Sequence, residues 1–128
     1  MMTFGVSKYL MALGIFALAS ACNAETTAFP PSCLKLLKVV DQCSSDGIDF
    51  VRMKKFEAQV VQIETSRQAI YQSFLQRLKD DGYAAFSDAC SGEDFKKAIR
   101  LPQIRVADAM DKVGGNSASC RRAIDTLK

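Results

Sequence analysis

The chain has 128 residues, with 17 Lys and Arg, 14 Asp and Glu, five cysteines, no histidine and no tryptophan. Histidine is the commonest general base and metal ligand, so its absence excludes Ser-His-Asp and Cys-His catalysis. The cysteines form no C-x-x-C pair, which excludes a thioredoxin-like or zinc-ribbon site. Pairs of adjacent basic residues are scattered along the chain and form no dense basic run, which argues against a nucleic-acid partner. We therefore expect a protein that is not an enzyme and has no catalytic residues, metal or cofactor.

Residues 1–24 have the three parts of a secretory signal peptide. Lys8 is the only charged residue of this segment, an apolar run covers residues 9–19, and small residues occupy 19–21. Because a membrane span needs about 20 apolar residues, the run is too short to cross a bilayer. We therefore expect an exported protein, located in the periplasm or in the outer membrane as a lipoprotein, or otherwise secreted.

The end of the signal peptide has two alternatives. Cleavage after Ala24 removes Cys22 and leaves four cysteines, an even number. Alternatively, residues 18–22 resemble a bacterial lipobox, with Ala19 where the usual leucine stands. That resemblance implies a signal peptide of residues 1–21, lipidation of Cys22, and contact with a membrane only through this lipid anchor.

After the signal peptide, residues 25–31 are expected to form a linker and residues 32–128 a single helical domain. No segment shows the two-residue alternation of apolar and polar side chains that predicts a strand. We therefore predict an all-α fold, a small disulfide-stabilised helical bundle of about five helices.

Two long helices are predicted first. One covers residues 32–46 and ends at Gly47. The next covers residues 50–81 without glycine or proline, and at 1.5 Å per residue it would be about 48 Å long. That length exceeds the diameter of about 33 Å expected of this domain. Either the helix breaks near Thr65-Ser66, or its overhang packs on a partner such as a second copy in a homodimer.

Arg67 lies in the middle of the apolar stripe of the predicted 50–81 helix. One interpretation is that its stem covers apolar surface while its guanidinium pairs with Glu64. The other interpretation is that Arg67 contacts a protein partner.

The C-terminal half predicts shorter helices. They cover residues 83–90, 93–101, about 103–113 and 118–127. Pro102 separates the second of these from the third, because proline disfavours a helix interior.

Cys33, Cys43, Cys90 and Cys120 are expected to form two disulfides, because an exported protein folds in an oxidising compartment. Cys33 and Cys43 lie on one predicted helix about 15 Å apart, whereas a disulfide needs Cα atoms within about 7 Å. Each must therefore pair with Cys90 or Cys120. Antiparallel stacking of the helices favours the pairs Cys33–Cys90 and Cys43–Cys120.

These observations favour a small cell-envelope protein that acts by binding another, unidentified protein, as an inhibitor, immunity or accessory factor does. An alternative is a periplasmic stress chaperone that exposes an apolar face, since the chain has a sizeable set of aromatic residues. A third hypothesis is a secreted eukaryotic helical factor, because a signal peptide is equally compatible with it.

Overall fold

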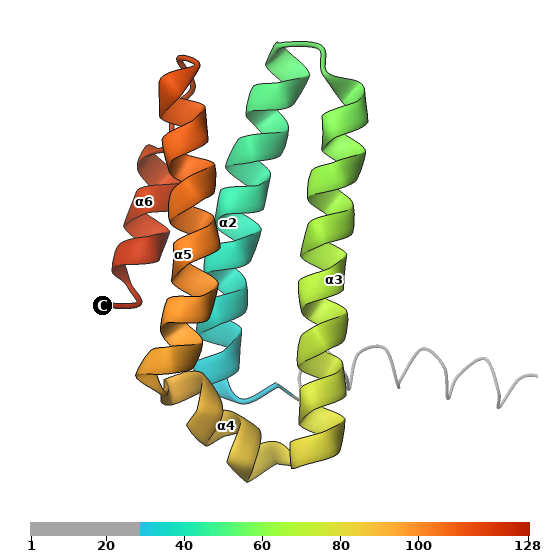
Figure 1. The fold of residues 1–128 in the computed structure, drawn as a ribbon, viewed down its shortest axis with the longest axis vertical. Coiled ribbons are helices and arrows are strands. Elements are labelled where there is room, and N and C mark those ends of the chain that lie inside the picture. The colour runs from blue at the N-terminus through green and yellow to red at the C-terminus, as the bar shows by residue number, and fades with distance from the viewer. Residues whose placement is uncertain (1–28) are drawn as a thin grey trace, which may run out of the picture.

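Helix α2 (Pro31–Met53) is the central element of the fold, because it packs against all four other helices of the computed structural model, which describes residues 29–128. Those are α3 (Glu57–Asp81), α4 (Tyr83–Ser91), α5 (Glu93–Lys112) and α6 (Ala118–Asp125). Helix α3 lies on one side of α2, and α5 and α6 lie on the other (Figure 1). Residues 29–128 contain no strand, so the predicted all-α bundle is confirmed.

Helix α2 does not end at Gly47, contrary to the sequence prediction, but continues to Met53. Gly47 is buried, and a Cβ atom there would lie 3.4 Å from Ile63 Cδ1 of α3. The missing side chain therefore lets the two helices approach closely. Ile48 and Val51 follow Gly47 and pack with Val60 in a small core of their own. This burial offsets the roughly 1 kcal/mol that a glycine costs inside a helix.

The predicted helix over 50–81 is also wrong, because the chain reverses direction at Lys54-Lys55 and α3 starts only at Glu57. Lys55 takes a positive φ of 63°, and the backbone amide of Phe56 donates to the carbonyl of Val51 over 2.8 Å. The result is a hairpin of two long helices in place of one overhanging helix (Figure 1).

Helix α3 is continuous through Thr65-Ser66, where the sequence suggested a break. The Thr65 hydroxyl donates to the carbonyl of Val61, one turn earlier in the same helix, over 2.8 Å. It therefore does not cap a new helix. With α2 and α3 both long and antiparallel, the overhang that motivated the break does not arise.

Pro102 lies inside α5 and does not interrupt it, which corrects the predicted boundary at this residue. A proline in a helix interior removes one backbone hydrogen bond and strains the preceding turn, at a cost of about 3 kcal/mol. Pro102 is exposed, while the neighbouring Gln103, Ala107 and Met110 are buried. Packing of that buried face holds the helix together across the proline.

The main core lies where α2, α3, α4 and α5 meet. The ring of Phe74 from α3 stands 5.5 Å from the rings of both Phe86 in α4 and Phe95 in α5, measured between centroids. Phe29 packs against the same core and is only 4% exposed. The last residues of the segment 25–31, expected as a linker, are therefore packed against the domain or begin α2.

Two disulfides fasten the other helices to α2. Cys33 pairs with Cys90 at the end of α4, and Cys43 pairs with Cys120 in α6, with Cα separations of 5.1 and 4.5 Å. These are the pairs expected from helix geometry. All four cysteines are buried. Both bridges lie between the first turn and the middle of α2, so the last three turns of that helix carry none.

Candidate functional site

Arg67 joins α3 to α2 by polar contacts within the chain. Its Nη2 donates to Glu64 Oε2 over 2.9 Å, and its Nη1 lies 3.4 Å from Asp41 Oδ1 on α2. Tyr71 OH donates to the other oxygen of Asp41 over 3.2 Å. The hydrogen bond to Glu64 raises the pKa of Arg67, and burial followed by the Asp41 carboxylate raises the pKa of Tyr71. The predicted contact with Glu64 is confirmed; the contact with a partner stays a prediction.

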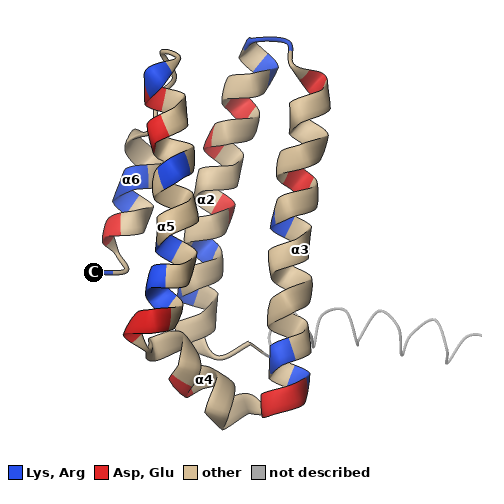
Figure 2. Cartoon of the chain, in the orientation of Figure 1, with Lys and Arg blue, Asp and Glu red and all other residues tan. Residues whose placement is uncertain are grey.

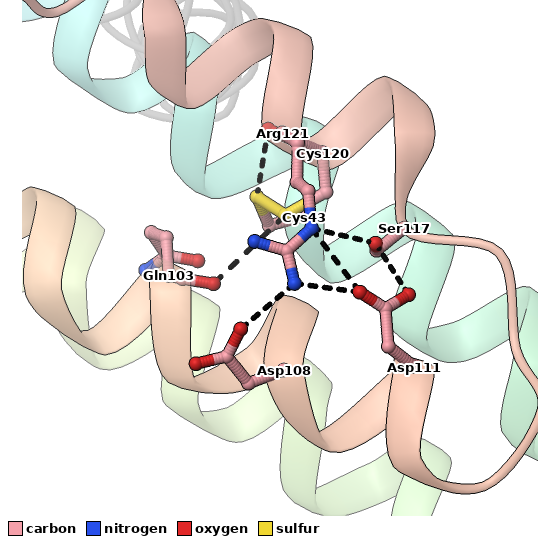
Figure 3. A network of polar contacts seen from close by, with 7 residues as sticks. All are labelled: Cys43, Gln103, Asp108, Asp111, Ser117, Cys120 and Arg121. Carbon is pink, nitrogen blue, oxygen red and sulfur yellow. Dashed lines mark hydrogen bonds and ion pairs between the residues drawn. A yellow bond between two sulfur atoms is a disulfide. The ribbon is translucent and has the colours of Figure 1, made fainter.

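A second polar network fixes α6 against the end of α5 (Figure 3). The Nη2 atom of Arg121 lies 2.7 Å from Asp108 Oδ1 and 2.6 Å from Asp111 Oδ2. Ser117 donates to Asp111 Oδ1 over 2.6 Å and accepts from Arg121 Nε over 3.0 Å. The Ser117 hydroxyl, followed by Arg121, lowers the pKa of the Asp111 carboxyl. The sequence does not predict this role for Arg121, because the two acids lie across a loop from it, where no helical spacing signals the contact.

Four exposed apolar side chains lie toward the end of the bundle where α2 turns into α3. We call this region the hairpin tip and define it as residues 52–57 together with Val61, Lys112 and Val113. Met53 is 74% exposed, Phe56 53% and Val61 65%. Val113 is 58% exposed and directly follows α5, which ends at the same end of the molecule (Figure 1). Exposed apolar side chains at one end of a domain are typical of an interaction surface.

The α5–α6 loop is held beside the tip by the ring of Phe50. A Cβ atom on Gly115 would come within 2.8 Å of Phe50 Cδ2 and 3.1 Å of the Met110 carbonyl. Only glycine allows the loop to lie this close to the ring. Gly114 has a φ of +83°, which glycine adopts without the strain that other residues suffer. The two glycines together keep Val113 in the tip.

The hairpin tip is also basic. Its cations are Arg52, Lys54, Lys55 and Lys112, and none of them forms an ion pair among residues 29–128. Glu57 is its only acidic residue. Figure 2 shows the basic loop at the top of the hairpin, and the Lys54 ammonium lies 5.9 Å from the centre of the Phe50 ring. The hairpin tip therefore combines apolar contact area with positive charge. This combination is complementary to a partner surface whose apolar centre is surrounded by carboxylates.

The sequence does not reveal this surface, because it predicts one continuous helix over residues 50–81, a range that includes Met53 and Phe56. Once the chain reverses at Lys54-Lys55, both side chains face solvent. The available signal was the placement of two lysines directly between two apolar residues. Cys22 and the predicted signal peptide lie outside the described residues.

Two further observations concern residues 29–128 alone. No three His, Cys, Asp or Glu side chains in this part are grouped so that they could hold a metal ion. None of its helices combines the length and the apolar character needed to cross a membrane. Two disulfides indicate an extracellular or otherwise oxidising compartment, because such bonds are rare where thiols are kept reduced.

No protein-family model, curated protein or solved structure shows a significant match to the chain. The functional interpretation therefore rests on the geometry and charge of the hairpin tip.

Proposed function

We propose that this protein is exported and acts by binding another protein through the hairpin tip, as an inhibitor, immunity or accessory factor of the cell envelope does. The observation that carries the proposal is the group of four exposed apolar side chains at the same end of the domain as four cations that form no ion pair within residues 29–128. Export is supported by the two disulfides and by the signal peptide predicted from residues 1–24. The chain is then free in the periplasm or medium, or held at a membrane by lipid on Cys22.

The chemistry of the tip specifies the partner's surface. Burial of an exposed side chain such as Met53 or Phe56 contributes about 1.5 to 3 kcal/mol. Lysine and arginine beside them favour a partner with Asp or Glu around an apolar depression, and they disfavour a basic one. Phe50 and Gly115 fix the adjoining loop, so part of the surface is ordered before binding and loses little entropy on association.

The experiment is capture from the host's envelope or culture fraction with the oxidised mature protein as bait, followed by a measured dissociation constant for the captured protein. The test variant Met53→Ser/Phe56→Ser removes apolar area from the tip. The matched control Tyr83→Ser/Leu101→Ser removes exposed apolar side chains elsewhere, which are 55% and 40% exposed. We expect the tip variant to lose the complex and the control to keep it.

Equal binding by both variants would reject the tip as the binding surface. A second arm tests the membrane as the tip's target, with phosphatidylcholine vesicles prepared with and without phosphatidylglycerol. Binding to the anionic vesicles that the tip variant abolishes, with no protein captured, would overturn the proposal in favour of a membrane-binding role.

A further inference from the structure

The outward side of α3 is a long exposed helix face without a single charge. Between Ala58 and Gln76 every exposed residue of α3 is uncharged. The only two charged residues in this stretch, Glu64 and Arg67, are partly buried and bond to each other. Figure 2 shows α3 uncoloured over most of this length, whereas charges recur along α2 and α5. Because protein surfaces are usually about a quarter to a third charged, this face is unusual.

The fold also leaves this face uncovered. Among the described helices α3 packs mainly on α2 and α4, and its Phe74 and Arg77 also lie against the Phe95 ring of α5. Helix α6 packs on the far side of α2. Figure 1 shows α3 standing at the edge of the bundle. A further helix could therefore lie along α3 without displacing any part of residues 29–128.

The exposed residues follow the spacing of a helix pair. Steps of four and three residues alternate, and this average of 3.5 is the period at which two α-helices stay in contact along a left-handed supercoil. We call these positions the α3 seam: Ala58, Gln62, Thr65, Ala69, Gln72 and Gln76.

We propose that the α3 seam is the contact surface of a homodimer in which α3 packs antiparallel against α3 of a second copy. In a two-fold interface residue i of one copy meets residue j of the other and j meets i, so a charge close to the axis lies beside the same charge of the second copy and is repelled. The α3 seam avoids this repulsion because it carries none. Glutamine suits such self-contact, since its amide both donates and accepts hydrogen bonds and can pair with its own copy.

The order of side chains along the seam selects the antiparallel orientation. With the two-fold axis between Thr65 and Ala69, Gln62 of one copy faces Gln72 of the other, so that amide meets amide. Ala58 then faces Gln76, and Thr65 faces Ala69, so small side chains lie opposite larger ones. A parallel pair would set Ala58 and Ala69 each against its own copy and leave gaps.

The size of the seam sets the strength of the dimer. It is about 28 Å long at 1.5 Å per residue and about 10 Å wide, the diameter of a helix. The resulting strip, about 300 Å² on each copy, is smaller than the roughly 800 Å² per partner of a standard stable interface. We therefore expect a reversible dimer with a dissociation constant of about 10 µM or weaker.

The test is analytical ultracentrifugation of the oxidised mature protein from about 5 µM to about 1 mM. We expect concentration-dependent dimerisation that Ala69→Glu weakens at least about tenfold, because it places two carboxylates near the two-fold axis. The matched control Ala109→Glu adds the same charge at an exposed position of α5 and should leave the dimer intact. A mixture of Ala69→Glu with Thr65→Lys should restore dimerisation, because these positions face each other only in the antiparallel pair.

A protein that remains monomeric at 1 mM would overturn the proposal. Equal weakening by Ala69→Glu and Ala109→Glu would place the contact elsewhere. Restoration by Ala69→Glu with Ala69→Lys, but not with Thr65→Lys, would reject the antiparallel orientation. None of these variants touches the hairpin tip, so the result is independent of the proposed binding function.

Discussion

Replacing Gly115 by alanine should destabilise the protein mainly through its shortest contact, with the ring of Phe50. The added Cβ atom would lie 2.8 Å from Phe50 Cδ2 and 3.1 Å from the Met110 carbonyl, so the ring or the loop must move. Overpacking of this kind costs about 1 to 3 kcal/mol. Gly114 is the matched control: it has a φ of +83° with nothing within 4 Å, so alanine there is strained by the backbone alone. That strain costs about 1 to 2 kcal/mol.

The assay is urea denaturation of the oxidised protein followed by circular dichroism, with each glycine variant combined with Phe50→Ala. Truncation of the ring should remove the clash, so Gly115→Ala and Phe50→Ala should combine to less than the sum of their separate effects, by about 1 to 3 kcal/mol. The effects of Gly114→Ala and Phe50→Ala should add within about 0.5 kcal/mol. Additive behaviour at Gly115 would refute the argument that Phe50 holds the loop in place.

Three other predictions concern the rest of the bundle. Cys43→Ala/Cys120→Ala should lower the free energy of unfolding by about 4 kcal/mol, from the entropy that the bridge removes from the unfolded chain; a loss below about 1 kcal/mol in denaturant titration would contradict it. Pro102→Ala should raise stability by about 1 to 3 kcal/mol by restoring a helix hydrogen bond; unchanged or lower thermal stability would count against this. The hydrogen bonds from Ser117 and then Arg121 lower the pKa of the Asp111 carboxyl in the folded protein below its ordinary value of 3.8. These contacts therefore stabilise the fold fully above pH 3.8, and the stabilisation is lost as the pH falls through the lowered pKa. Stability measured from about pH 5 to about pH 2 should therefore fall less steeply in Asp111→Asn, and identical slopes would exclude this contribution.

The disulfide pairing could be predicted from the sequence because it depends on helix geometry alone. Ten residues of helix keep Cys33 and Cys43 too far apart to bond, and the order of the helices assigns their partners. The helical class followed in the same way from the apolar spacing. The helical class uses a regularity along a single helix, and the pairing adds only the antiparallel order of neighbouring helices.

The ends of the helices could not be predicted, because packing between helices decides them. Gly47 usually signals a helix end, but here the close approach of Ile63 makes glycine suitable for the helix interior. Lys54-Lys55 gives no turn signal, and the chain reverses there because Val60 packs back on Ile48 and Val51. Pro102 is tolerated since it lies on the exposed side of α5. The hairpin tip depends on one of these boundaries, so it could not be identified before the reversal was known.

The placement of Phe29 and the hairpin tip at opposite ends of α2 has a practical consequence. The 23 residues of α2 separate these ends by about 34 Å. A label, a solid support or an acyl chain on the preceding segment is therefore joined to the domain at the end of α2 opposite the side chains that we expect to meet the partner. Immobilisation through the N-terminus leaves the tip accessible in binding measurements, whereas attachment through lysines would modify Lys54 and Lys55 directly.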